Sequence, residues 1–441
     1  MAIHLSDSFS YKKLLKFTFP SVIMSVFNSL YGIVDGLYVA NYAGKSALAA
    51  VNFAFPILLV MSAFGYMFGT GGNALVGKIL GEGKNKEANE LFSLFVYICI
   101  GFSILFSIVG FFSLRPLMQL FGAEGEMLEK AVCYGNILLI TLPCWNLQFL
   151  FQIMFVTAER AKLGLIVTLI SGCANMSLDV LFVGVLGFGI TGAAVATAIS
   201  QFIGAAIPLA YFFSKNTSLL RLGKAKFDWN AIVKGTTNGA SEFVVGVSSA
   251  LVGMLYNAQL IKYSGENAVA AYGIMMYASM IFIGIFFGYA NGSAPIVSYH
   301  YGAGNRKEVK NLFNKGMKMT VCVSVFMFLL SMILSDPLSS VFAGYDPELY
   351  SMTIHGFRIY AISFLFSGVA ILGSSFFTAL NNGLVSGVLS FLRTIIFQVG
   401  SVLLLPLIMG IDGVWFSAFI AEFLTVITTV IFVLKFKKFY F

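Results

Sequence analysis

Long apolar runs recur along almost the whole chain, and they restrict its fold more than any other feature. Polar breaks separate twelve such runs within the 441 residues. A helix needs about 20 predominantly apolar residues to cross the hydrocarbon core of a bilayer. The composition agrees with this reading, because 59% of the residues are hydrophobic and only 10% are charged, whereas about a quarter of the residues of soluble domains are charged. The sequence therefore predicts an all-α polytopic membrane protein and excludes a soluble globular enzyme.

The basic residues predict how the chain is oriented. Most lysines and arginines fall on alternate connections between the apolar runs, and the opposite connections hold only Lys45, Arg115, Lys130 and Lys262. Cytoplasmic loops carry an excess of Lys and Arg, so both termini are predicted to be cytoplasmic in a multi-pass protein of the cell (plasma or inner) membrane. An even number of spans is then required. The twelve predicted spans are 12–41, 48–80, 88–113, 126–157, 163–187, 190–213, 230–263, 269–300, 309–334, 348–378, 384–409 and 412–434.

The second half of the chain repeats landmarks of the first half at a constant offset of 221 residues. Gly81-Glu-Gly83 reappears as Gly302-Ala-Gly304, and Gly189-Ile-Thr-Gly192 reappears as Gly410-Ile-Asp-Gly413. Both halves start on the same side of the membrane, which is typical of parallel repeats about an axis along the membrane normal. We expect an N-lobe (1–214, helices 1–6), a cytoplasmic linker (215–229) and a C-lobe (230–441, helices 7–12) around a central cavity.

Two lobes that can rock against each other indicate a transporter, and the sequence offers no nucleotide site to power it. The nearest match to a phosphate-binding loop is Gly44-Lys45-Ser46, where Val39 stands in place of the required glycine. The five cysteines form no C-x-x-C pair, and the three histidines form no H-E-x-x-H motif. We therefore predict ion-coupled secondary transport, with no enzymatic activity, no cofactor other than the coupling ion and no nucleic-acid partner.

Four polar residues of the N-lobe are predicted to lie close together inside the membrane. Asp35, Asp179 and Thr197 all fall roughly 7–12 Å below the outer boundary of their spans. Asn175 precedes Asp179 by one helical turn and shares its face. Carboxylate, amide and hydroxyl oxygens suit a hard cation such as Na⁺, or the two acids can hold one shared proton. The structural alternative is that each residue caps a neighbouring backbone group or binds water.

Glu242 and Pro20 are further candidates for function. Glu242 falls near the middle of helix 7, where a carboxyl group must be protonated or paired. It can bind a cationic substrate, carry a coupling proton or make a structural hydrogen bond. Pro20 removes a backbone donor fifteen residues before Asp35 and permits a kink in helix 1, either as a moving bend that controls access to Asp35 or as a fixed one used in packing.

The other charged residues within the spans have simpler interpretations. Glu422 is predicted to form a structural ion pair with Arg393 on the adjacent helix, because the two lie at nearly the same depth. His355 is interpreted as a satisfied interior histidine, and the sequence identifies no partner for Arg358.

Several of these segments resemble one known family. Tyr31-Gly-Ile-Val-Asp35-Gly-Leu-Tyr38, followed by Gly44 and Ala49-Ala50-Val51, resembles the first helix and loop of the multidrug and toxic compound extrusion (MATE) family. Asn238-Gly-Ala-Ser-Glu242-Phe243 is similar to the helix 7 motif of its bacterial members. The resemblance implies twelve helices in two lobes and export of organic cations in exchange for sodium or protons. It also implies that an ion is coordinated by the residues matching the family's N-lobe site, which are Asp35, Asn175, Asp179 and Thr197.

The resemblance is incomplete in the C-lobe, and a second function competes with drug export. Other family members carry coupling acids on helices 7 and 10, but helix 10 here offers Arg358 and His355 and no carboxylate. The competing function is a lipid-linked oligosaccharide flippase of the same superfamily, whose cavity must stabilise a diphosphate with basic residues. The membrane interior is predicted to hold four acids and only two bases, which favours small organic cations as cargo. The acids are Asp35, Asp179, Glu242 and Glu422, and the bases are Arg358 and Arg393. The transporter is expected to act as a monomer in the lipid bilayer.

Overall fold

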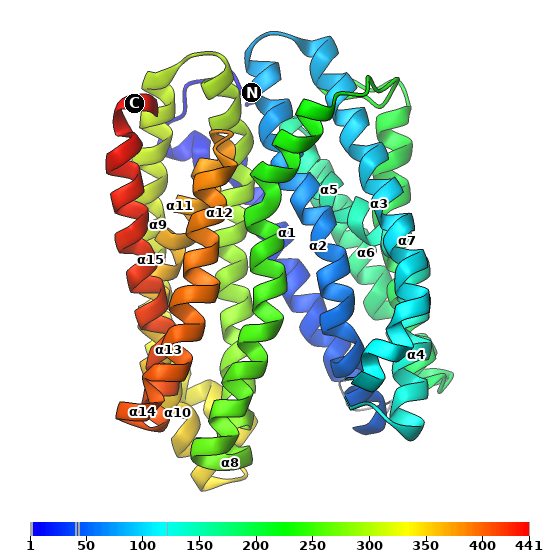
Figure 1. Cartoon of the computed structure of the whole chain (residues 1–441), viewed down its shortest axis with the longest axis vertical. Coiled ribbons are helices and arrows are strands. Elements are labelled where there is room, and N and C mark those ends of the chain that lie inside the picture. The colour runs from blue at the N-terminus through cyan, green and yellow to red at the C-terminus, as the bar shows by residue number, and fades with distance from the viewer. Residues whose placement is uncertain (1–2, 40–41, 43–44, 121, 441) are drawn as a thin grey trace.

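The computed structural model describes residues 3–39, 42, 45–120 and 122–440, which form helices joined by short connections, with no β-strand among them (Figure 1). Gly44 of the first loop motif lies outside the described residues. The N-terminal half contains α1 Tyr11–Tyr38, α2 Lys45–Gly81, α3 Asn85–Leu120, α4 Gly125–Ile140, α5 Leu142–Thr157, α6 Ala161–Asp179, the π-helix Val180–Val185 and α7 Gly189–Phe213. The C-terminal half contains α8 Trp229–Gly302, α9 Arg306–Ala343, α10 Pro347–Ala361, α11 Phe364–Ala379, α12 Gly383–Phe391, the π-helix Leu392–Gln398, α13 Val399–Leu404, α14 Pro406–Met409 and α15 Ile411–Tyr440.

The predicted twelve-span layout is confirmed. Nine helices of the described chain are individually long and apolar enough to cross a membrane. Two more crossings are bent pairs, α4 with α5 at 55° and α10 with α11 at 45°. The 74 residues of α8 would extend about 110 Å as one straight helix. However, Gly265 adopts non-helical angles (φ 71°, ψ −157°), which favour glycine, and divides α8 into two crossings.

Each half of the chain forms a lobe with its own apolar core (Figure 1). In the N-lobe, α1–α7, a cluster of phenylalanines that includes Phe92, Phe151 and Phe212 is almost completely buried. In the C-lobe, α8–α15, Tyr256 and Trp415 lie at the centre of the corresponding cluster. Both termini lie at the same end of the molecule (Figure 1), as an even number of crossings requires.

The two lobes pack backbone to backbone at the end that holds the termini. A Cβ atom on Gly81 of α2 would collide with the carbonyl oxygen of Tyr299 of α8, and one on Gly302 would collide with the carbonyl oxygen of Lys78. The two contacts are related by the 221-residue repeat, so the pseudo-two-fold axis of the molecule passes between them. Away from this closed end, α2 and the N-terminal part of α8 diverge (Figure 1).

The residues before α1 cross from one lobe to the other at this closed end. We call residues 3–10 the N-terminal strap. Its Leu5 amide donates to Glu159 between α5 and α6 (2.6 Å), and its Phe9 amide donates to Glu308 on α9 (2.8 Å). Lys315 of α9 donates to the Phe9 carbonyl oxygen at 2.5 Å. The side chains of Leu5 and Phe9 are buried, so the strap is part of the packed closed end.

Candidate functional site

Asp35 and Asp179 meet inside the N-lobe. Asp35 lies in the last two turns of α1, and Asp179 is the final residue of α6, two helices that pack against each other. The two carboxyl groups are close enough to interact directly. Asp179 is completely buried, whereas Asp35 is partly exposed. The predicted convergence of these two acids is therefore present, and their role in coupling remains a prediction.

The amide and hydroxyl of the predicted site also come together. Asn175 lies one turn before Asp179 on α6, and its Nδ2 donates to Thr197 Oγ1 on α7 at 3.4 Å. Among the described residues, Asn175 Oδ1, Asp35 Oδ1 and both carboxyl oxygens of Asp179 accept no hydrogen bond. Buried polar atoms in proteins are nearly always paired, so this cluster of open acceptors indicates a place for a ligand.

The donor set fits a small hard cation or a shared proton. Two carboxyls, one amide oxygen and one hydroxyl are all hard oxygen ligands, of the kind that bind sodium rather than a soft metal. Nowhere in the described ranges do three His, Cys, Asp or Glu side chains gather as a metal cluster. The chain immediately after Asp179 becomes a π-helix, a feature that is frequent at functional sites.

Sequence reasoning missed Tyr134 as a neighbour of this site. Tyr134 on α4 is buried and lies close to both Asp35 and Asp179. Tyr31, one turn before Asp35 on α1, is also near that carboxyl. The sequence could have identified Tyr31, because it lies four residues before Asp35 on the same helix. No sequence signal places Tyr134, because it comes from a helix distant in the chain.

Glu242 lies in a second place, at a cavity between the lobes. The cavity is small and is bounded by α2 and α5 of the N-lobe and by α8 and α11 of the C-lobe. Its polar lining consists of one carboxyl, two carboxamides and three hydroxyls, and none of its described lining residues is basic. The residues that line it are Thr70, Asn73, Ala74, Ile153, Glu242, Asn291, Ala294, Ser375, Thr378 and Ala379.

The other charged residues of the C-lobe have structural partners. Arg393 and Glu422 form the predicted ion pair, with Arg393 Nη2 2.6 Å from Glu422 Oε1 and Nε bonded to both carboxyl oxygens. The prediction that His355 is interior is wrong, because its side chain is 61% exposed and contacts Asp412 at 2.8 Å. This aspartate lies in the first turn of α15, and the sequence spacing does not reveal the contact. Arg358 Nε donates to Ser335 Oγ at 3.4 Å.

Pro20 lies within α1, which continues as one helix from Tyr11 to Tyr38. The structure therefore shows no break of the helix at this residue. The function of Pro20 as a point of bending stays a prediction.

Comparison with known proteins gives consistent results. A family model described as MatE matches residues 20–181 and again residues 243–404. The multidrug export protein MepA of Staphylococcus saprophyticus is 21% identical over 428 residues, which cover 95% of this chain and 92% of the relative. The protein of the same name from Staphylococcus aureus strain MSSA476 is 22% identical over 436 residues, which cover 96% and 93%.

Solved structures agree on the fold. The outward-facing conformation of a multidrug resistance MATE family transporter of the MOP superfamily superposes with a TM-score of 0.91 at 20% identity, over 98% of each chain. A MOP superfamily transporter from Pyrococcus furiosus Vc1, described as having a binding pocket of reverse polarity that suggests a different function, gives 0.89 at 19% identity, over 98% of this chain and 97% of the other. The family model matches each lobe once and covers most of the chain, and the chain therefore belongs to the MatE family of membrane transporters.

Proposed function

We propose that this protein exports organic compounds, mostly cationic and amphipathic, across the plasma membrane in exchange for Na⁺ or H⁺. Both termini and the N-terminal strap face the cytoplasm, as the distribution of Lys and Arg predicts. The two lobes rock so that the inter-lobe space opens to one side of the membrane at a time. The names of the MepA relatives, multidrug export proteins, support this direction of transport.

The observation that carries the proposal is the separation of two acidic sites. Asp35 and Asp179 lie inside the N-lobe with open acceptors, whereas Glu242 lies at a cavity between the lobes that has no basic lining residue. Arg393 is the basic residue that acts on Glu242, but its guanidinium is paired with Glu422, so the Glu242 carboxyl in this low-dielectric site favours a cationic ligand. A coupling ion in the first site and an organic cation in the second would therefore act on the same rocking motion from different positions.

The polarity of the inter-lobe cavity also opposes the competing function. A flippase for a lipid-linked diphosphate needs basic residues at its cavity, and Arg393 is already paired with Glu422. In the Pyrococcus furiosus transporter, it is the reverse polarity of the binding pocket that suggests a different function for that protein. An acidic cavity therefore supports a cationic cargo here.

Transport by the purified protein in proteoliposomes tests this proposal. A fluorescent organic cation is loaded, and its movement is measured with a sodium gradient, a proton gradient or no gradient. We expect one gradient to drive uphill movement of the dye. If neither gradient does so, and a lipid-linked oligosaccharide is moved instead, the export of cations is contradicted.

Glu242→Gln provides the matched test of substrate charge. Replacing the carboxyl with an isosteric amide removes the negative charge, so the affinity for a monovalent organic cation should fall about tenfold, a change of ~1.4 kcal/mol. A neutral dye of similar size should bind with unchanged affinity. Equal losses for the two dyes would show that Glu242 shapes the cavity and does not recognise charge.

A further inference from the structure

One face of α6 is polar over more than three turns, although the helix crosses the membrane. Thr168, Ser171, Asn175 and Asp179 follow each other at intervals of three or four residues and are all buried. This spacing places them on one face, over a rise of about 16 Å. Ionisable residues within membrane helices are rare and commonly mark ion pathways, and Asp179 is such a residue at the end of this face.

Side chains from three neighbouring helices extend this polar face. Asn28 of α1 donates to Gln152 of α5 at 3.2 Å, and Gln152 donates to Thr168 at 3.2 Å. One turn further along, Gln148 of α5 donates to Ser171 at 3.3 Å, and Ser171 donates to the backbone oxygen of Ser200 on α7 at 2.8 Å. The Asn175–Thr197 bond follows next. These hydrogen bonds form three separate groups along the face, and the carboxyl oxygens of Asp179, one turn beyond Asn175, accept none.

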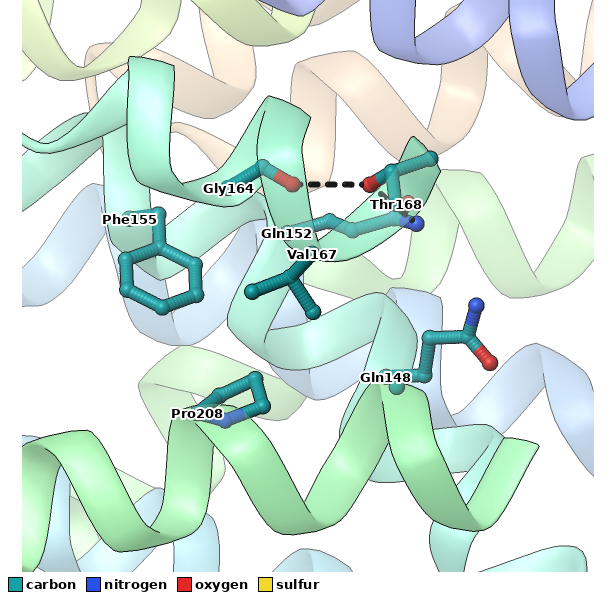
Figure 2. A pocket seen from close by; sticks show the side chains of 8 residues that line it. Gln148, Gln152, Phe155, Gly164, Val167, Thr168 and Pro208 are labelled. Carbon is teal, nitrogen blue, oxygen red and sulfur yellow. Dashed lines mark hydrogen bonds between the residues drawn. The ribbon is translucent and has the colours of Figure 1, made fainter. Parts of the chain in front are cut away.

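A cavity adjoins the far end of this face, and Figure 2 shows Gln148, Gln152 and Thr168 at its lining. It is a small cavity between α5, α6 and α7, and Phe155, Val167 and Pro208 also line it (Figure 2). The surface of the cavity is apolar, because the Gln152 amide and the Thr168 hydroxyl bond to each other and the Gln148 amide bonds to Ser171. No described lining residue is shared with the inter-lobe cavity at Glu242.

The cavity lies between the two acids and the closed end of the molecule. Thr168 is only seven residues from Ala161, where α6 begins. Glu159, just before that helix, holds the N-terminal strap. The polar face thus runs within the N-lobe towards the end where α2 and α8 seal the space between the lobes.

Two of the buried open acceptors of the described residues belong to this polar face. They are Asn28 Oδ1 and Asn175 Oδ1, which accept no hydrogen bond from any described residue. Packing alone would favour paired oxygens, because an unpaired buried acceptor costs about 1–3 kcal/mol. Oxygens of this kind can instead ligate a passing cation or hold the waters that carry it.

We propose that the coupling ion passes between the Asp35–Asp179 site and the cytoplasm through the N-lobe, along this face of α6. The organic substrate uses the separate space between the lobes. Amide and hydroxyl oxygens serve Na⁺ directly and serve a proton through bound water, so the path suits either ion. This inference rests on the proposed function, because it requires that Asp35 and Asp179 hold the ion.

Ion exchange in proteoliposomes tests the path with conservative variants. Thr168→Val removes the hydroxyl that accepts from Gln152, and Gln152→Leu removes the amide that links α1 to α6. Thr353→Val in α10 is the matched control, because Thr353 is also buried and its hydroxyl also donates to the carbonyl one turn earlier. Radioactive sodium and a pH-sensitive dye inside the vesicles report exchange of either ion. Equilibrium binding of the organic dye and the unfolding temperature are measured for each variant.

We expect exchange of the ion that drives wild-type transport to slow about tenfold in Thr168→Val and Gln152→Leu, equivalent to ~1.4 kcal/mol on the barrier. Dye binding by all the variants, and ion exchange by Thr353→Val, should match the wild type. If Gln152→Leu does not fold, Thr168→Val carries the test. If the folded variants exchange the ion as fast as the wild type does, and the wild-type protein transports the dye in a gradient-driven way, the path is overturned and the proposed function stands. Absence of ion-driven transport by the wild type overturns the proposed function and the path together.

Discussion

The buried acids of the two lobes differ in how they are compensated. Glu422 accepts three hydrogen bonds from Arg393, whereas Asp35 and Asp179 face each other with open oxygens. A paired carboxylate has no free capacity for a ligand, and two facing carboxyls repel each other unless a cation or proton lies between them. A carboxyl group within the membrane therefore has a structural role at Glu422 and is a candidate for coupling at Asp35 and Asp179.

The Arg393–Glu422 pair should be important for stability. Arg393→Met leaves Glu422 as an uncompensated buried carboxylate, which should cost about 3–5 kcal/mol. The unfolding temperature in detergent should fall clearly, and the double variant Arg393→Met/Glu422→Leu should recover most of the loss. Arg115→Met, which breaks an exposed ion pair with Glu129, should have almost no effect. A double variant as unstable as the single one would contradict the assignment.

At the scale of elements, the N-terminal strap is attached to the N-lobe through a contact that depends on pH. His4 Nδ1 lies 2.7 Å from Glu159 Oε2. Glu159, with a smaller contribution from Asp7, raises the pKa of His4 above its ordinary 6.5. Protonated His4 therefore favours the attached strap. This contribution is fully present below pH 6.5 and is lost as the pH rises through the raised pKa of the folded state.

Hydrogen exchange of the strap amides tests this dependence. Amides of residues 3–10 should be better protected at pH 6 than at pH 8.5, after correction for the intrinsic exchange rate. His4→Gln should lose this difference and keep the buried Leu5 and Phe9 contacts. Equal pH dependence in the wild type and in His4→Gln would show that His4 does not control attachment.

The glycines that join α2 to α8 should tolerate no side chain. Gly81→Ala and Gly302→Ala place a methyl group against the facing backbone, and such overpacking costs roughly 1–3 kcal/mol. Both variants should unfold at a lower temperature than the wild type. Gly101→Ala in α3 is the control, because a Cβ atom there meets nothing within 4 Å. Normal stability of both packed variants would mean that the lobes are not held together at these glycines.

At the scale of the molecule, the sequence predicts what depends on local pattern. Apolar run length and polar breaks identify the twelve crossings, and the common depth of Asp35 and Asp179 anticipates their convergence. The sequence does not predict Tyr134 beside these acids, the strap across the lobes or the exposed pair of His355 with Asp412. Each of these depends on contacts between segments distant in the chain, which spacing within one helix does not encode.

The central claim is that an ion at Asp35 and Asp179 drives the movement of an organic cation through the other site. The most direct test compares uphill accumulation of a fluorescent organic cation with its gradient-free exchange, using Asp35→Asn and Asp179→Asn in proteoliposomes. Asp412→Asn, at an exposed acid, is the control. We predict that both site variants lose uphill accumulation but still bind the dye, while the control behaves as the wild type does. Uphill accumulation at the wild-type level in Asp35→Asn and Asp179→Asn would contradict the account.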